Sequence, residues 1–275
     1  MTLFQSILLG IIQGLTEFLP VSSSAHLVIT PYILGWNIPE ESAFIFDVLV
    51  QMGTLIAVIV YFWRDLVTIL KAFILGILHR QPFSDHQSRL GWLLILATLP
   101  AVLAGVLLKD IVEQAFSSPI ATAIFLIVTA GFLVMAERLG KKIRHFEQLG
   151  WLDGLVIGLF QALSLFPGVS RSGSTITGGM LRGFDRKGAA RFSFLMSVPV
   201  MLGAGGLAVL DLLQLPDFGA QIPTVLVGFF AALIVGYLSI RWLLGYLTRH
   251  SFYGFAAYCL AAAAITLLVV LIRGG

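Results

Sequence analysis

Two short polar stretches interrupt otherwise apolar parts of this 275-residue sequence, and they hold most of the side chains that could do chemistry. The first contains Gln13, Glu17, a run of three serines and His26; the second places Arg171 between two serines. Gln13 and Glu17 are four residues apart, so they share one face of a helix. A carboxylate, hydroxyls, a histidine and an arginine are the groups that phosphoryl transfer needs, because that reaction depends mainly on positioning and charge stabilisation.

The first stretch combines a helix end with a helix start. Pro20 stops the helix that precedes it, which places Glu17 in the last turn, at the negative end of the helix dipole. A carboxylate there needs a cation or a proton, unless it only caps the turn. Ser22, Ser23 and Ser24 then open the next helix, where a serine is a natural N-cap and the free amide groups form an anion site.

The second stretch repeats this arrangement around a fixed positive charge. Ser170 and Ser172 flank Arg171, whose planar guanidinium suits phosphate or carboxylate and cannot lose its charge. Glu17 could be its anion in a purely structural ion pair. His26 lies on the helix face of the serines, so it is either a proton-transfer group or a hydrogen-bonded packing residue.

The composition shows what kind of element must hold these groups. Hydrophobic residues make up 58% of the chain and charged residues 11%, against about 25% charged in an average soluble protein. The mean hydropathy is +0.97, and the 28 glycines suit helices that pack closely in lipid. A soluble enzyme is excluded.

Six apolar runs approach the roughly 20 residues that a bilayer-spanning helix needs. They cover about 43–63, 90–108, 119–137, 188–212, 222–247 and 253–272. The polar stretches interrupt two further apolar regions, 3–35 and 151–184, whose halves are too short to cross. We therefore predict an all-α polytopic membrane protein with six full transmembrane helices and two re-entrant helix–break–helix hairpins.

The basic residues predict the orientation, because Lys and Arg accumulate on the cytoplasmic side of a membrane protein. In this layout 14 of the 17 fall on one side, within the segments 64–89, 138–144, 182–191 and 241–249. The other side receives Lys109 and Arg273, and Arg171 falls inside the second hairpin. Both termini are therefore expected outside the cytoplasm.

An internal repeat relates the two hairpins. Shifting residues 10–24 by 148 positions gives seven identities in fifteen without a gap. We predict a single membrane domain over 1–275 with internal repeats of about 1–137 and 150–275. Three full spans, an odd number, separate the copies, so the repeat has inverted topology and the two broken tips meet near the midplane.

Other function classes have little support. The pI is near 9.2, but no basic stripe indicates nucleic acid. The single cysteine, Cys259, permits no disulfide framework, and the N-terminus does not read as a cleaved signal peptide. The motifs of phosphate-binding loops, zinc proteases and nucleophile elbows are absent. Asp47 and Gln51 share a face of the first span and either line a cavity or pack against a neighbouring helix.

The two motifs resemble those of the bacterial undecaprenyl-pyrophosphate phosphatase family associated with bacitracin resistance. Residues 13–26, QGLTEFLPVSSSAH, are similar to its Glu/Gln-x-x-x-Glu motif with the following Ser and His, and residues 167–175, PGVSRSGST, to its Pro-Gly-x-Ser-Arg-Ser-x-x-Thr motif. The resemblance implies an inner-membrane enzyme that removes the terminal phosphate of undecaprenyl pyrophosphate and recycles the lipid carrier for peptidoglycan synthesis. Together with the charge pattern it favours a site open toward the periplasm.

The resemblance also implies roles for individual residues. Glu17 would bind a divalent cation, Mg²⁺ or Ca²⁺, or act as a base; Arg171 would clamp the pyrophosphate; Ser23 would be the candidate nucleophile and His26 its proton partner. The remaining phosphate-binding candidates are Ser22, Ser24, Ser170, Ser172, Gly173 and Thr175. Gln13 is the neutral variant of the first motif position and could still offer an oxygen to the metal.

Alternatives to this enzyme remain open at this stage. A lipid-phosphate transporter or flippase would use the same inverted-repeat architecture, although Ser23 and His26 together favour hydrolysis. A type 2 lipid phosphatase is disfavoured because no histidine occurs within 172–187. The sequence does not distinguish attack by Ser23 from attack by water. It is compatible with a homodimer and leaves the metal, the oligomeric state and the prenyl chain-length range open.

Overall fold

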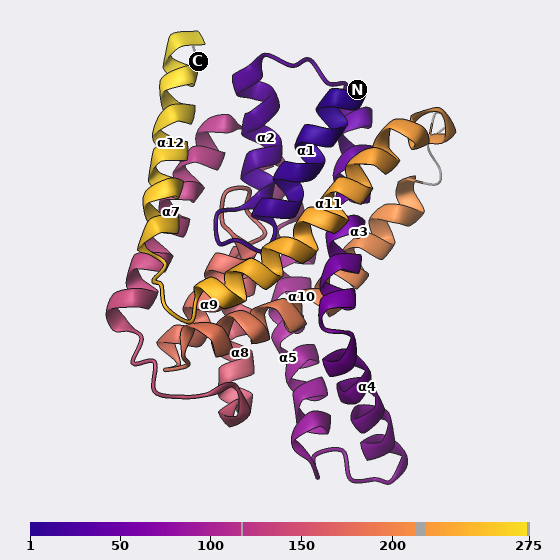
Figure 1. The fold of residues 1–275 in the computed structure, drawn as a ribbon, viewed down its shortest axis with the longest axis vertical. Helices are drawn as coiled ribbons and strands as arrows, with labels where there is room; N and C mark the ends of the chain where they lie inside the picture. Colours follow the sequence, from indigo (N-terminus) through magenta and orange to yellow (C-terminus); the bar gives the residue numbers. More distant parts are fainter. Residues whose placement is uncertain (117, 213–217, 274–275) are drawn as a thin grey trace.

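The structure, a computed structural model, describes residues 1–116, 118–212 and 218–273, which form an all-helical bundle (Figure 1). The helices are α1 (Leu3–Thr16), α2 (Ser23–Leu34), α3 (Glu40–Tyr61), α4 (Trp63–Leu78), α5 (His86–Leu107), α6 (Lys109–Phe116), α7 (Pro119–Leu139), the short 3-10 helix η1 (Phe146–Gln148), α8 (Trp151–Leu163), α9 (Arg171–Leu181), α10 (Arg186–Leu212), α11 (Phe218–Tyr246) and α12 (Tyr253–Arg273). Within the described residues there is no strand, so the predicted all-α class is confirmed.

Six of these helices are long and apolar enough to cross a membrane. Their spans are Glu41–Tyr61, His86–Leu107, Pro119–Leu139, Arg186–Leu210, Ile222–Tyr246 and Tyr253–Arg273. Each overlaps one of the six predicted runs, with boundaries that differ by a few residues. The protein is therefore a multi-pass membrane protein.

Two helices were not expected from the sequence. Helix α4 follows α3 after a break at Phe62 and packs antiparallel against α5, so the segment assigned to a basic loop is largely helical. Helix α6 is a short amphipathic segment between α5 and α7. Helix α4 has 16 residues and carries Arg64 and Lys71, so it is shorter than the roughly 20 apolar residues that a bilayer-spanning helix needs.

Each predicted hairpin has its two ends close together. At the first, Phe4 near the start of α1 makes an edge-on ring contact with Trp36, just beyond α2. At the second, Asp153 near the start of α8 accepts hydrogen bonds from Arg144 and from Arg182, which follows α9. The hydrogen bonds to Asp153 raise the pKa of Arg144, which therefore stays charged. This geometry is compatible with helix–break–helix hairpins that enter and leave on one side.

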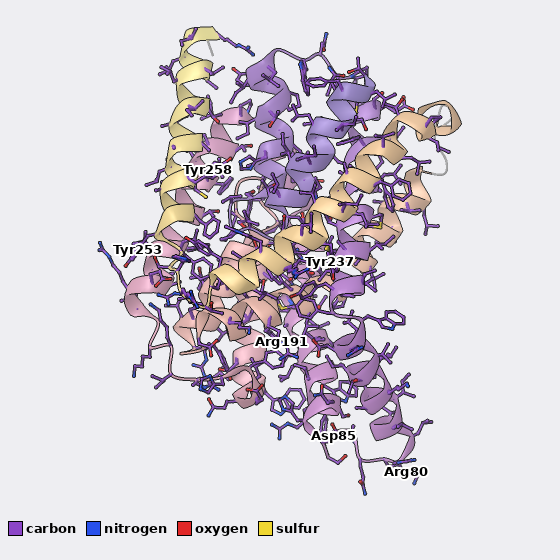
Figure 2. All side chains as sticks on the ribbon, in the orientation of Figure 1. Arg80, Asp85, Arg191, Tyr237, Tyr253 and Tyr258 are labelled. Carbon is purple, nitrogen blue, oxygen red and sulfur yellow. The ribbon has the colours of Figure 1, made fainter. Side chains whose placement is uncertain are left out.

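The two hairpins approach the middle of the molecule from different ends. The start of α1, the end of α2 and the end of α12 lie at one end of the molecule, whereas α8 begins in the opposite half (Figure 1). Arg80 and Asp85 lie at the far tip of the α4–α5 pair, and Arg191 lies in the same half (Figure 2). Opposed entry of the hairpins is compatible with the inverted layout, which stays a prediction from the 148-residue shift.

Glycines allow each hairpin to contact a full span at close range. A Cβ atom at Gly10 of α1 would lie 2.4 Å from the carbonyl oxygen of Gly228 in α11. At the position 148 residues later, a Cβ at Gly158 of α8 would lie 2.6 Å from the carbonyl oxygen of Ala97 in α5. Such backbone approach replaces the hydrophobic drive that lipid does not supply between helices. The first helix of each hairpin is thereby held at a fixed depth.

Replacing Gly158 by alanine is expected to lower stability by about 1–3 kcal/mol, because the added methyl group forces α8 away from α5. The matched control is Gly131→Ala in α7, where a Cβ meets nothing within 4 Å. That change should be neutral or slightly stabilising, since alanine favours helix by about 1 kcal/mol over glycine. Thermal unfolding in detergent measures both, and equal midpoints would contradict the close contact.

Candidate active site

The tip of the first hairpin is a short turn that ends α1 and starts α2. Proline at position 20 has no amide hydrogen, and Glu17 closes α1 as its C-cap. Ser22 is the N-cap of α2, with its hydroxyl oxygen accepting a hydrogen bond from the amide of Ala25. The backbone of Ser22 has φ of 70°, a left-handed conformation that is costly for a residue with a side chain. Such strain is typical of functional turns.

The tip of the second hairpin is built in a similar way. Gly168 has φ of +102°, and a Cβ there would lie 2.4 Å from the carbonyl oxygen of Thr122, so this position requires glycine. Ser170 is the N-cap of α9, and its hydroxyl oxygen accepts a hydrogen bond from the amide of Gly173 at 3.1 Å. Thr129 of α7 holds the turn by donating to the Gly168 carbonyl and accepting from the Ser170 amide.

The serines at the two tips form matching pairs. The hydroxyl oxygens of Ser22 and Ser24 are 3.2 Å apart, and those of Ser170 and Ser172 are 3.1 Å apart. Both pairs lie at helix N-termini, where the first amide groups have no acceptor within the helix. Two helix starts therefore point their positive dipole ends into the same region.

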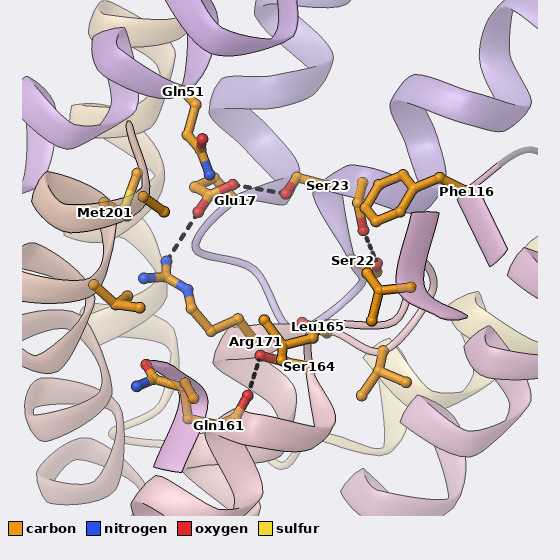
Figure 3. A pocket seen from close by; sticks show the side chains of 17 residues that line it. Glu17, Ser22, Ser23, Gln51, Phe116, Gln161, Ser164, Leu165, Arg171 and Met201 are labelled. Atoms are coloured by element: carbon orange, nitrogen blue, oxygen red, sulfur yellow. Dashed lines mark hydrogen bonds and ion pairs between the residues drawn. The ribbon is translucent and has the colours of Figure 1, made fainter. Parts of the chain in front are cut away.

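The Glu17 carboxylate connects the two tips (Figure 3). Its Oε2 accepts a hydrogen bond from the hydroxyl of Ser23 at 2.6 Å, and its Oε1 accepts one from Nη2 of Arg171 at 2.9 Å. Gln13 adds a third hydrogen bond, from Nε2 to Oε2 at 2.9 Å. The ion pair is largely buried, with Glu17 at 8% exposure and the Arg171 side chain at 17%. Ser23 and Arg171 are the first residues of α2 and α9, so one carboxylate is shared by both helix starts.

Glu17, Ser23 and Arg171 line a cavity of about 330 Å³. Its walls come from both hairpin tips and from α3, α5, α6 and α10, and include Gln51, Ala101, Val112, Phe116, Val200 and Met201. Two buried polar atoms at its edge, Nη1 of Arg171 and Oε1 of Gln161, have no hydrogen-bond partner among the described residues. An unpaired buried donor is costly, so a guanidinium nitrogen of this kind, on an arginine that lines the cavity, indicates an anionic ligand.

Comparison with known proteins identifies the family. The family model described as bacitracin resistance protein BacA matches residues 6–265. This chain is a member of the BacA family. It is 44% identical to an undecaprenyl-diphosphatase of Thermomicrobium roseum, with 98% of this chain and 99% of the relative covered. It is 43% identical to an undecaprenyl-diphosphatase of Moorella thermoacetica, with 99% and 100% covered, and 44% identical to that of Chlorobaculum tepidum, with 94% and 93% covered.

In this BacA family member, only part of the set of residues predicted from the sequence lines the cavity. Those that do are Glu17, Ser22, Ser23, Ser24, Ser170 and Arg171. Gln13 does not line the cavity but donates a hydrogen bond to Glu17. Its buried Oε1 has no partner among the residues described here. The remaining phosphate-binding candidates have structural contacts. Ser172 links the two tips by donating to the Leu19 carbonyl, the Gly173 amide bonds to Ser170, and Thr175 bonds to Ser193 and to the α9 backbone.

The predicted pairing of His26 with Ser23 is not the arrangement in the structure. His26 Nδ1 lies 2.7 Å from the carbonyl oxygen of Ser22, which can only accept, so Nδ1 carries the proton. Nε2 lies 2.8 Å from the hydroxyl of Tyr258 in α12, and neutral imidazole then accepts that hydrogen. Both ring nitrogens are occupied, and the Ser23 hydroxyl is bonded to Glu17 instead. His26 holds the strained turn at Ser22.

Sequence reasoning missed several neighbours of the site. Tyr258 lies 232 positions from His26, and no motif connects them. Gln161 lies 148 positions after Gln13, so the internal repeat could have assigned it to the cavity that it lines. The sequence did not decide whether Asp47 and Gln51 of the first span line a cavity. In the structure Gln51 lines it, whereas Asp47 does not.

Replacing Tyr258 by phenylalanine is expected to lower kcat about fivefold with little change in KM, because one hydrogen bond of about 1 kcal/mol that orients His26 is lost. Tyr253→Phe, an exposed tyrosine of the same helix, is the matched control and should leave turnover unchanged. Steady-state kinetics and the thermal midpoint are measured together. A fall in the midpoint that accounts for the lost turnover, or unchanged kcat, would contradict a positioning role.

Proposed function

We propose that this protein is an undecaprenyl-diphosphatase, an integral membrane hydrolase that converts undecaprenyl pyrophosphate to undecaprenyl phosphate and inorganic phosphate. The observation that carries the proposal is the Glu17 carboxylate between the Ser23 hydroxyl and the Arg171 guanidinium, at the wall of one cavity. A nucleophile, a base and an anion clamp are then in one place. Family membership and three undecaprenyl-diphosphatase relatives support the same activity.

Each group has a role in this reaction. Arg171 binds the pyrophosphate through its unpaired Nη1, and the amide groups at the starts of α2 and α9 neutralise further negative charge. Glu17 takes the proton of the attacking hydroxyl, which is that of Ser23 or of a water bound beside it. Attack on the terminal phosphorus breaks its bond to the bridging oxygen, and undecaprenyl phosphate leaves. Attack by water releases inorganic phosphate directly, whereas attack by Ser23 leaves a phosphoserine that a water molecule then hydrolyses to inorganic phosphate and free serine. Trapping a phosphate on Ser23 would assign the nucleophile to the serine.

A divalent cation is part of the proposal. The described residues contain no cluster of three or more His, Cys, Asp or Glu side chains that could hold a metal. Mg²⁺ does not need such a cluster, since it is commonly held by one or two carboxylates together with substrate phosphates and water. Glu17 and the unpaired Oε1 of Gln13 are the oxygen donors that fit this pattern. The cation, Mg²⁺ or Ca²⁺, would neutralise charge on the pyrophosphate.

Phosphate release by the purified protein in detergent tests the activity. With undecaprenyl pyrophosphate and Mg²⁺, we expect inorganic phosphate to appear without any membrane gradient. Chelation by EDTA should stop release, and added cation should restore it. Movement of lipid across vesicles without phosphate release would instead support a transporter and overturn the proposal.

The proposed location is the bacterial inner membrane, with the cavity open toward the periplasm. Helix α6, which lines the cavity, follows α5 at the end away from Arg80. Cysteines introduced at exposed Asn37 and Ser84 would test this with an impermeant maleimide applied to spheroplasts. We expect labelling at position 37 alone; labelling at 84 alone would reverse the orientation. A homodimer is the assembly to test first, by light scattering in detergent.

A further inference from the structure

An apolar groove lies between α3, α4, α5 and α10. It has a volume of about 340 Å³, and all its lining residues are apolar. Leu70, Ile95 and Leu202 at its rim are 58%, 41% and 53% exposed, so the groove is open to lipid. Its floor includes Gly91, where a Cβ would lie 2.8 Å from the ring of Phe73. Nothing in the catalytic arrangement described above uses this groove.

The groove and the candidate active site share two walls. On α10 the groove residues Pro199 and Leu202 alternate with the cavity residues Val200 and Met201. On α5 the groove is lined by Leu94 and Ile95, and the cavity by Ala101, about two helical turns or ~10 Å further along. Helices α5 and α10, which pack against each other, therefore border both the cavity and the groove, and the seam is their line of contact.

Prolines weaken both helices along this seam. Pro100 directly precedes Ala101 in α5, and Pro199 directly precedes Val200 in α10. A proline inside a helix removes one backbone hydrogen bond and favours a bend. Both helices can therefore bend next to the residues with which they line the cavity.

We propose that this groove binds the first part of the substrate's prenyl chain, after the chain leaves the cavity along the α5–α10 seam. The inference rests on the proposed function, because only a substrate with a polar head and a long apolar chain needs both compartments. The chain is uncharged, as is every side chain that lines the groove. The groove thereby sets which polyprenyl pyrophosphates bind tightly.

A second apolar groove, lined by α1, α11 and α12, is a poorer candidate for the same chain. Leu19 and Val21 of the first hairpin tip line it, whereas Glu17 and Ser22 of the same tip line the cavity. Phe18, fully buried, lies within that tip. This second groove shares one tip with the cavity, whereas the first groove shares the packed pair α5 and α10 with it.

Substitutions that fill the groove test the proposal by chain length. Ile95→Trp and Leu202→Trp should raise KM for undecaprenyl pyrophosphate about tenfold or more, as expected when apolar contacts are lost from a binding pocket, with kcat unchanged. KM for geranyl pyrophosphate, whose two isoprene units are too short to fill the groove, should stay the same. Leu260→Trp, on the lipid-facing side of α12, is the matched control. Equal effects on both substrates, or none on either, would overturn the proposal.

Photolabelling of the unmodified protein tests it without any variant. The probe is a prenyl pyrophosphate with a benzophenone placed after its second isoprene unit, competed with undecaprenyl pyrophosphate. We expect competed label on the segments 66–73, 91–95 and 198–202. Label on α1, α11 and α12, label spread over all lipid-facing helices, or no competed label would refute the groove. Absence of phosphate release from either substrate by the unmodified protein would instead refute the proposed function.

Discussion

Replacing Arg171 by lysine is expected to lower phosphate release about 100- to 1,000-fold. That is the usual cost of removing one preorganised charge-stabilising donor from an active site. In Arg171, Nη2 bonds to Glu17 and leaves Nη1 for the substrate. Lysine keeps the positive charge but has a single nitrogen in place of the planar fork, so it cannot make both contacts in this geometry. Phosphate release by the purified variant in detergent, at saturating and limiting substrate, measures the loss.

The control for this change is an arginine that is ion-paired outside the cavity. Arg191 pairs with Asp65 at 2.9 Å and is partly exposed, so Arg191→Lys should change turnover less than twofold. Thermal midpoints of both variants show whether either is misfolded. If folded Arg171→Lys protein turned over at a near-normal rate, Arg171 would not be the pyrophosphate clamp.

Replacing Glu17 by glutamine is expected to lower turnover about 100- to 10,000-fold, the range for loss of a general acid or base. Glutamine keeps the size of the side chain but cannot take the proton from Ser23, which donates to Glu17 at 2.6 Å. It also leaves Arg171 without its anion, so some loss of stability is expected. Activity is therefore compared per folded molecule, with the folded fraction taken from thermal unfolding.

One further variant is the control for the Glu17 substitution, and a double variant tests whether Glu17 acts through Ser23. Glu147→Gln removes an exposed carboxylate in the segment before α8 and should be without effect. If Glu17 acts through Ser23, the double variant Glu17→Gln/Ser23→Ala should be no slower than Ser23→Ala alone, because residues that act as a unit are not additive. Multiplying losses in the double variant would show that Glu17 acts independently of the serine.

The six spans and the break points of the hairpins could be predicted because a bilayer imposes a strict length and polarity on what crosses it. Helix α4 could not, because at 16 residues it is about 24 Å long and carries Arg64 and Lys71, so it resembles a solvated loop. Helix α6 could not be predicted either, because its eight residues are too few to cross a bilayer. Short amphipathic helices depend on what they pack against, and the sequence does not show the packing.

The site could be predicted as far as its chemistry was local. Ser22 and Ser170 could be recognised as N-caps because a serine next to a helix break satisfies free amide groups. The Glu17–Arg171 contact was one of the alternatives that the sequence left open, because the repeat brings the two tips together and a buried arginine needs an anion. The partner of His26 did not follow, since Tyr258 comes from the last helix and reaches His26 only through tertiary packing.

The 154 residues that separate Glu17 from Arg171 bear on how the protein is made. At about 5–20 residues per second, translation reaches Arg171 roughly 8–30 s after Glu17 (154 residues divided by the rate). During this time the first hairpin has an acidic tip without its cationic partner, and an unpaired charge is costly at membrane depth. We therefore expect the nascent first hairpin to wait near the bilayer surface and to take its final depth only after the second hairpin is synthesised.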